Sequence, residues 1–173
     1  MTLRVFAAAL LAGGVLAAGQ AYAQAPNLDA IPDKMPFATP YGPPISMDRA
    51  QSLIQAAVAE AKKRGWDMNV AVVDPHGDLK AFGRMDNAQY ASISIAQHKA
   101  RTAVRYRRPT KAFEEGVTKA GLNYLLTLDD VIASRGGIPL VENGKIIGAV
   151  GCSGGTGSQD EAVCMAAAAV VNK

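Results

Sequence analysis

The sequence has few of the residues that hold metals, and it has no apolar run long enough to cross a membrane. Its N-terminal apolar run, residues 5–18, is about 14 residues long, whereas a membrane-spanning helix needs about 20. The chain contains only two cysteines and two histidines, and no Cys-x-x-Cys pair. This scarcity argues against a structural zinc site.

The N-terminus has the pattern of a secretory signal peptide. A basic residue, Arg4, precedes the apolar run, and the small-x-small pattern Ala21-Tyr22-Ala23 follows it. We therefore expect residues 1–23 to be a signal peptide and the mature chain to begin near Gln24. This predicts export to the periplasm or the medium, with no membrane span in the mature chain; a retained anchor is the alternative.

The charge of the mature chain is small. Removing residues 1–23 takes away one of the 18 Lys and Arg residues and leaves 17 against 15 Asp and Glu, a net charge of +2. Nucleic-acid binding usually requires a much larger positive charge. We expect no nucleic-acid partner.

Proline is concentrated in one segment, residues 24–45. Six of the nine prolines lie there, and the segment shows no helical or strand periodicity. Because proline lacks an amide proton and fixes its backbone angle, we expect an extended N-terminal arm. The arm is either a loose spacer or an element that lies across a neighbouring subunit. Residues 46–173 are long enough for one domain with one core.

The order of elements in residues 46–173 predicts an α+β fold. Ser46 and Gly65 are suitable ends for a first helix, and Asn143-Gly144 is a strong hairpin turn. Hairpins dominate, and no repeated strand–helix–strand crossover is present, so an antiparallel sheet with helices packed on it is expected. The expected strands are 66–73, 79–85, 131–134, 138–141 and 145–152, and the expected helices are 46–65, 92–104, 110–121 and 160–171.

The two cysteines are placed at the end of a strand, Cys152, and inside the next helix, Cys164. An oxidising compartment permits a disulfide if the helix brings the two Cα atoms within about 7 Å. The alternative is a pair of small buried hydrophobic residues. The sequence favours this second interpretation and does not decide between them.

A glycine-rich loop, residues 153–158, joins the last strand to the last helix. Successive glycine amides before a helix can bind an anion, which makes Gly154 and Gly155 candidate binding residues. However, Asp160 and Glu161 in the first helical turn would satisfy the same partial positive charge and repel an anion. No Lys-Ser/Thr pair follows, so the loop is not a P-loop. We expect a structural corner that also forms one wall of a pocket.

Four motifs occur here in one order, and together they resemble the GlcG/HbpS family, whose domain is also found attached to corrinoid adenosyltransferases. The resemblance covers nearly all of residues 46–171. It implies a profilin-like five-stranded antiparallel sheet flanked by helices, assembled into homo-oligomers. The motifs are residues 71–77, 99–103, 136–140 and 148–161.

The resemblance also implies a ligand, because secreted members similar to this chain bind haem and have proposed roles in haem or iron sensing and in haem degradation. Covalent c-type attachment is excluded, since no Cys-x-x-Cys-His motif is present. In haem-binding relatives a threonine that matches Thr102 is implicated as an iron ligand. The alternative for Thr102 is a hydrogen bond to a carbonyl one turn earlier.

The helix around Thr102 contains the other candidate haem-binding residues. His98 is the better imidazole candidate, since His76 lies in a turn and is expected to face solvent. A basic stripe beside an apolar wall would suit the carboxylates of haem, although such a stripe is more often a solvated helix face. The candidate haem-binding set is His98, Lys99, Arg101, Thr102, Arg105, Gly154 and Gly155, with His98 and Thr102 as metal ligands.

Two other functions remain open. Family members encoded beside glycolate oxidation genes suggest an enzyme or binding protein for a small carbonyl or hydroxy acid, whose carboxylate Lys99 or Arg101 would hold. The third hypothesis is a non-catalytic partner in a periplasmic complex that uses the N-terminal arm. No catalytic residue is assigned, because acidic doublets such as Glu114-Glu115 and Asp129-Asp130 are typical of solvated surfaces.

Overall fold

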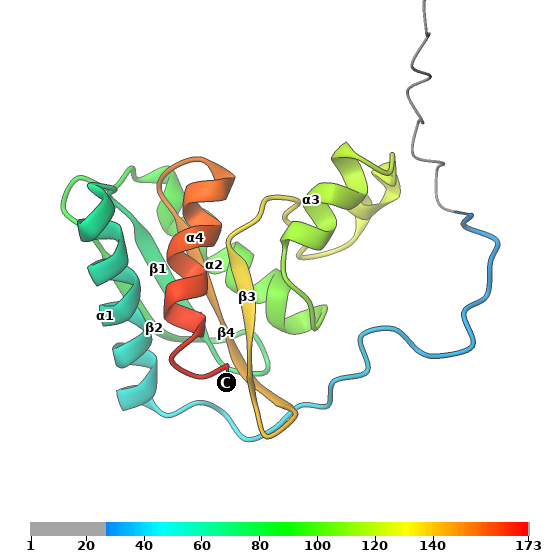
Figure 1. Cartoon of the computed structure of the whole chain (residues 1–173), viewed down its shortest axis with the longest axis horizontal. Coiled ribbons are helices and arrows are strands. Elements are labelled where there is room, and N and C mark those ends of the chain that lie inside the picture. The colour runs from blue at the N-terminus through cyan, green and yellow to red at the C-terminus, as the bar shows by residue number, and fades with distance from the viewer. Residues whose placement is uncertain (1–26, 173) are drawn as a thin grey trace, which may run out of the picture.

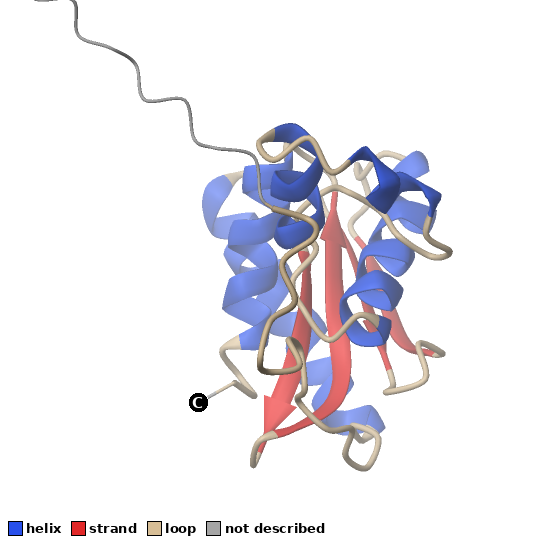
Figure 2. Cartoon of the chain, turned by 90° about the vertical axis from the view of Figure 1, so that its right-hand side faces the viewer, coloured by secondary structure: helices blue, strands red, loops and turns tan. Residues whose placement is uncertain are grey.

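The computed structural model describes residues 27–172, which form an antiparallel sheet with helices on both faces (Figures 1 and 2). The expected signal peptide, residues 1–23, lies outside these residues. The α+β class is confirmed. The elements are α1 Met47–Arg64, β1 Asn69–Val73, β2 Leu79–Arg84, α2 Ala91–Arg105, α3 Lys111–Thr118, the 3-10 helix η1 Asn123–Thr127, β3 Gly137–Glu142, β4 Lys145–Ser153 and α4 Gly157–Ala168.

The sheet has the strand order β2-β1-β4-β3, and every neighbouring pair is antiparallel. It consists of two hairpins joined side by side through β1 and β4. The turn of the second hairpin is Asn143-Gly144, and both residues have positive φ angles, 50° and 71°. This is the geometry that Asn-Gly favours, so the expected turn is confirmed.

The expectation of five strands is wrong for the described residues, because residues 131–134 form no strand. Their backbone groups bond elsewhere. The Val131 amide donates to the Leu128 carbonyl, and the Ile132 amide donates to the hydroxyl of Thr102. The segment is therefore held by a local turn and by a helix side chain instead of a neighbouring strand.

The ends of the first helix are as expected, but the start of α3 differs. Ser46 accepts a hydrogen bond from the Arg49 amide, and Gly65 ends α1 with a φ of 70°. Thr110 does not cap α3 as its position suggested; its hydroxyl accepts from the Gly137 amide at 2.9 Å instead. Thr110 thus links the start of α3 to β3.

Helices α1 and α4 cover one face of the sheet and α2 covers the other. The first core contains Leu53, Val72, Val150 and Val163, whereas the α2 core is built mostly from alanine and valine. Glycine lets α2 approach closely: a Cβ atom on Gly151 would lie 2.1 Å from the Ala96 carbonyl oxygen, and one on Gly137 would lie 2.2 Å from the Lys99 carbonyl oxygen. Backbone contact therefore fixes where α2 lies.

Part of the N-terminal arm packs against its own domain. The Ile146 amide donates to the Pro40 carbonyl, the Gly42 amide donates to the Ile146 carbonyl, and the Ile45 amide donates to the Ile147 carbonyl, each at 2.8 Å. The Tyr41 hydroxyl donates to the carbonyls at the end of α2. Residues 40–45 therefore extend the sheet beside the start of β4 (Figure 1).

Cys152 and Cys164 form a disulfide, so the preference for two unpaired cysteines was wrong. Helix α4 packs over the end of β4 and brings the two Cα atoms to 5.5 Å. Both cysteines are fully buried. The sequence could not establish this distance, because it depends on the packing angle of α4.

Breaking the disulfide should lower the free energy of unfolding. A cross-link between residues separated by 12 positions is worth about 3 kcal/mol through the entropy of the unfolded chain. We expect a reductant to lower the urea midpoint of the wild-type protein. The double variant Cys152→Ala, Cys164→Ala is the control, since its midpoint should not respond to reductant. A wild-type midpoint that ignores reductant would contradict the assignment.

Candidate functional site

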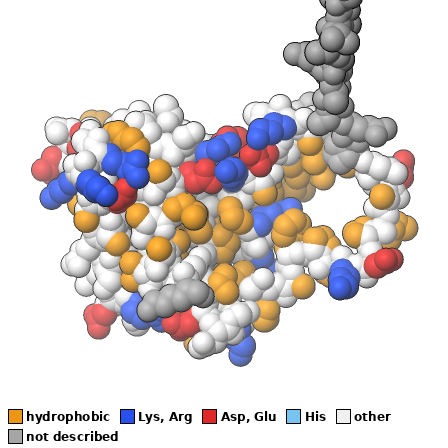
Figure 3. Space-filling model, in the orientation of Figure 1, with side chains coloured by type: hydrophobic (Ala, Val, Ile, Leu, Met, Phe, Trp, Pro, Cys, Tyr) orange, Lys and Arg blue, Asp and Glu red, His pale blue; other side chains and the backbone are white. Residues whose placement is uncertain are grey.

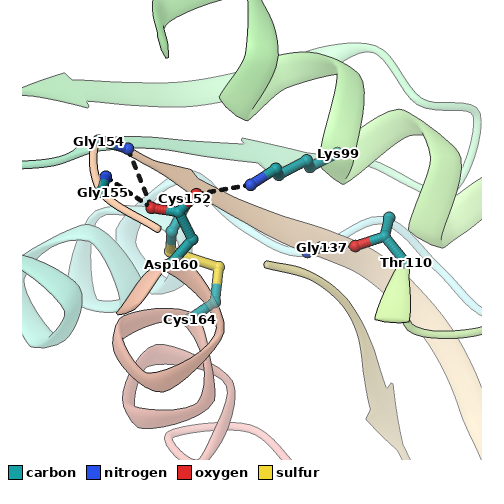
Figure 4. The surroundings of a disulfide bond; sticks show 8 residues. All are labelled: Lys99, Thr110, Gly137, Cys152, Gly154, Gly155, Asp160 and Cys164. Atoms are coloured by element: carbon teal, nitrogen blue, oxygen red, sulfur yellow. Dashed lines mark hydrogen bonds and ion pairs between the residues drawn. A yellow bond between two sulfur atoms is a disulfide. The ribbon is translucent and has the colours of Figure 1, made fainter. Parts of the chain in front are cut away.

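The glycine-rich corner binds a carboxylate of the protein itself (Figure 4). One oxygen of Asp160, Oδ1, accepts hydrogen bonds from the amides of Gly154 and Gly155, both at 3.0 Å. The other oxygen, Oδ2, accepts from the Lys99 ammonium at 2.6 Å. The two glycine amides that could cradle an external anion are thus occupied, and the loop is a structural corner.

The Lys99–Asp160 ion pair is almost completely buried, with the two side chains 1% and 3% exposed. A buried charge is costly unless a counter-charge and hydrogen bonds compensate it, and here both are present. The pair links α2 to α4 across the end of β4. Lys99 is therefore a residue of the interior, and its ammonium is not presented to a ligand at the surface.

Thr102 is fully buried and fastens a loop. Its hydroxyl donates to the Asp130 carbonyl at 2.5 Å and accepts from the Ile132 amide at 3.1 Å. The bond to a carbonyl one turn earlier is replaced by these two contacts with the 129–132 loop. The hydroxyl proton is thus already engaged in holding this loop against α2.

His98 has a free ring nitrogen. Its Nε2 atom is buried and has no hydrogen-bond partner among residues 27–172. Burial, and secondly the nearby positive charge of Arg101, lowers the pKa of His98 below its ordinary value. The imidazole is therefore neutral at neutral pH, which is the form that coordinates metals.

The expected basic stripe consists of Arg101, Arg105 and Arg108, and its arginines differ in their contacts. Arg108 stacks on the rings of Phe37 and Phe113. Arg105 forms an ion pair with Asp130, and its Nε donates to the His76 carbonyl at 3.2 Å. Arg101 makes no hydrogen bond or ion pair with any described residue and is half-buried. Arg101 is thus the stripe residue whose guanidinium is free for a ligand.

Cavities lie near some of these residues. One of about 470 Å³ lies at the end of α2 and is lined by Tyr41, Gly42, Pro75, His76 and Arg105. His76 is exposed, as expected, and lies at this cavity. A second, of about 320 Å³, includes Gly154 and Gly155 in its lining, so these glycines do form a pocket wall. The largest of those described, about 540 Å³, lies at the end of α1.

Sequence reasoning missed the partner of Lys99, because Asp160 is 61 residues away. One signal was present: Lys99 lies on the apolar face of its helix next to Ala96 and Ala100, where a lysine needs a counter-charge. The acidic doublets are also more engaged than expected. Glu114 binds Arg135 at 2.6 Å, and Asp130 binds Arg105.

Two absences apply to the part of the chain that the structure describes. Within residues 27–172, no three His, Cys, Asp or Glu side chains come together in a way that could hold a metal ion. Over the same residues, no helix is both long and apolar enough to cross a membrane.

Comparison with known proteins identifies relatives of this chain. The family model described as "Haem degrading protein HbpS-like" matches residues 45–169. The chain is 44% identical to Protein GlcG of Escherichia coli strain K12 over 109 residues, which is 63% of this chain and 81% of GlcG.

Two solved structures are similar over most of the chain. The crystal structure of HbpS has a TM-score of 0.71 and 30% identity, and the match covers 76% of this chain and 93% of that one. The crystal structure of a PduOC:Heme complex has a TM-score of 0.67 and 30% identity, and the match covers 75% and 96%.

Removing the charge of Asp160 should destabilise the protein strongly. Asp160→Asn keeps an oxygen for the two glycine amides but leaves the Lys99 ammonium buried without a counter-charge, at a cost on the order of 3–5 kcal/mol. The companion variant Asp160→Asn, Lys99→Met removes both charges and should recover most of this loss. Urea unfolding measures both.

A matched control is Glu161→Gln, which removes a half-buried carboxylate from the next position of α4. Its ion pairs with Lys111 and Arg135 are partly exposed, so the loss should stay below about 1 kcal/mol. Equal losses for Asp160→Asn and Glu161→Gln would show that the buried ion pair contributes no more to the free energy of unfolding than a partly exposed one.

Proposed function

The chain belongs to the HbpS-like family, and from this premise we propose that it binds haem. The observation that carries the proposal is the buried Nε2 atom of His98, which has no hydrogen-bond partner among residues 27–172. A related structure, PduOC, was solved in complex with haem, which supports the same ligand. The role of each candidate haem-binding residue on α2 is considered in turn below.

His98 is the side chain best suited to be an axial ligand of the haem iron. Iron in proteins is commonly held by a neutral imidazole nitrogen, and burial keeps His98 neutral by lowering its pKa. A bound haem would supply an iron centre, which the Nε2 atom of His98 would hold. The protein's contribution is to hold the imidazole on α2 with its Nε2 atom unbonded but covered, so an iron reaches this nitrogen once the groups that cover it move.

Thr102, the ligand that the family resemblance implies, has a different role in this proposal. Its hydroxyl holds the 129–132 loop through Asp130 and Ile132, so it could reach an iron only after the loop had moved away. We assign Thr102 to positioning the loop beside His98, one helical turn earlier. Direct ligation by Thr102 is the alternative that the variants below separate from it.

Arg101 is suited to bind a haem carboxylate. It is close enough to His98 to affect its charge, it is half-buried, and its guanidinium is unpaired among the described residues. Charge-assisted bonds from arginine to carboxylates are among the stronger polar contacts in proteins. Arg105 would contribute less, because Asp130 already occupies it.

The biological role proposed with haem binding is sensing, scavenging or degradation of haem or iron by an exported homo-oligomer. The signal-peptide pattern in residues 1–23 supports export to the periplasm or the medium, and the family resemblance supports oligomers. The alternative of a small hydroxy acid keeps only Arg101 of its expected contacts, because Lys99 and the glycine amides already hold Asp160.

Hemin titration of the mature protein, residues 24–173, tests this function. We expect a Soret band that saturates at a fixed ratio per subunit. His98→Ala should shift the band and weaken binding by more than about tenfold, the scale on which metal affinity responds to changes at its ligands. His76→Ala is the control and should leave the band unchanged.

Each other result has a definite meaning. A rise in absorbance that never saturates would contradict haem binding. An unchanged band in His98→Ala, together with a shifted band in Thr102→Val, would move the ligand to Thr102.

The lowered pKa of His98 predicts how hemin affinity depends on pH. Coordination requires the neutral ring, and a ring with a lowered pKa takes up a proton only below the ordinary value of 6.5. Affinity should therefore persist to a lower pH than an ordinary histidine ligand would allow, and should decrease as the pH falls through the lowered pKa of His98. Titrations at a series of pH values measure this, and a decrease that begins above pH 7 would contradict the proposed ligand.

A further inference from the structure

A groove lies at the end of α1, and His98 lines neither of the two cavities that form it. It consists of the 540 Å³ cavity and the adjoining 320 Å³ cavity, which share Trp66, Asp67 and Asn87. We call it the Trp66 groove. We propose that it binds a neutral, polyhydroxylated ligand of one or two sugar rings. Its main side chains are Lys62, Trp66, Asp67, Arg84, Asp86 and Asn87.

The walls of the groove are rigid. Gly65 ends α1 in the left-handed conformation and turns the chain into Trp66, whose ring packs against the main core. On the other side, β1 and β2 pair up to Asn69 and Arg84, and the Met85 amide then donates to the Met68 carbonyl at 3.0 Å. A site built on paired strands and a helix end is preformed and needs little ordering on binding.

Part of the lining is apolar. Val58, Trp66 and Met85 contribute hydrocarbon, sulfur and an indole ring. The flat C–H face of a sugar ring needs such a surface, and tryptophan combines a large apolar face with one N–H donor. The exposed Arg64 guanidinium lies 5.1 Å from the centroid of the Trp66 ring, so a sugar ring that stacks on the same face displaces it. In the space-filling view, hydrophobic, basic and acidic side chains lie next to one another at the upper left, where the end of α1 lies (Figures 1 and 3).

The polar side chains of the groove are available to a ligand. Lys62, Asp67, Arg84, Asp86 and Asn87 make no hydrogen bond or ion pair with any residue in the range 27–172; Arg84 only stacks on a tyrosine ring. Together they offer N–H donors, carboxylate acceptors and an amide that does both. Hydroxyl groups, which donate and accept, match this mixture.

The charges of the groove favour a neutral ligand. Lys62 and Arg84 balance Asp67 and Asp86, so the charges of the lining cancel. The end of α1 adds the partial negative charge of a helix C-terminus, which disfavours an anion. The two basic side chains disfavour a cation. The carboxylates of haem would also meet Asp67 and Asp86, so haem is a poor occupant here.

A buried acceptor lies close to the groove but outside its lining. Asn69 is fully buried, and its amide nitrogen donates to the carbonyl of Gln89, which lines the smaller cavity. Its Oδ1 atom has no donor among the described residues. Because Asn69 lines neither cavity, this oxygen marks an incompletely bonded side chain at the start of β1 and is not itself a ligand contact.

The test uses the fact that Trp66 is the only tryptophan in the chain. Cellobiose and N,N′-diacetylchitobiose are titrated into the mature protein, residues 24–173, while Trp66 emission is recorded, and calorimetry is run in parallel. We expect a saturable change with at least one of these neutral probes. Glucuronate and glucosamine, which carry a charge, should bind more weakly.

Variants identify the site. Asn87→Ala and Asp86→Ala should each weaken binding by about tenfold, the effect of losing one good hydrogen bond to the ligand. The matched control Gln51→Ala removes an exposed polar side chain near the start of α1 and should have no effect. Far-UV circular dichroism and urea unfolding confirm that each variant is folded.

Two results would overturn the proposal. One is the absence of a saturable response to both neutral probes in fluorescence and in calorimetry. The other is binding that Asn87→Ala and Asp86→Ala leave unchanged. Neither result depends on haem, because neither candidate iron ligand, His98 or Thr102, lines the groove.

Discussion

The buried ion pair between Lys99 and Asp160 is the interaction on which the rest of the structure depends. It joins α2 on one face of the sheet to α4 on the other, at the end of β4. The carboxylate also binds the amides of Gly154 and Gly155, so one side chain completes both the ion pair and the strand-to-helix corner. The Cys152–Cys164 disulfide holds the same helix to the same strand. Together these contacts fix α4 relative to β4 and α2.

The position of α2 sets the geometry of the proposed haem site. Glycines at 137 and 151 let its backbone touch the sheet, so its lysine and alanines face inward while His98 and Arg101 stay half-buried at the side. Thr102 then holds the 129–132 loop along the same helix. A neutral imidazole, a free guanidinium and a clamped loop are thereby brought to one stretch of helix, which is the basis of the haem proposal.

The N-terminal arm connects to the same helix. Its Tyr41 donates to the last carbonyls of α2, and its Phe37 stacks on Arg108, with the ring centroid 3.8 Å from the guanidinium carbon. Arg108 also stacks on Phe113 at 4.6 Å, and burial lowers its pKa. The arm thus contacts the end of the helix that carries His98.

The Trp66 groove lies at the end of α1, and α1 and α2 pack on opposite faces of the sheet, so the two binding proposals are spatially separate.

The sequence by itself determined the local features of this protein. Ser46 and Gly65 mark the ends of α1, and Asn143-Gly144 marks a hairpin, because each signal acts within a few residues. The α+β class followed from the order of such elements, and the motifs identified the family. The candidate residues on α2 could also be named, since their spacing along one helix is a local property.

Only the tertiary structure decided the features that depend on distant neighbours. Residues 131–134 are apolar enough for a strand, but a strand exists only where another strand accepts its hydrogen bonds, and Thr102 takes that place. The disulfide depends on how α4 lies on β4, and the partner of Lys99 is 61 residues away. These contacts join segments whose separation in space is set by packing, and the distance between two residues along the chain does not determine that separation.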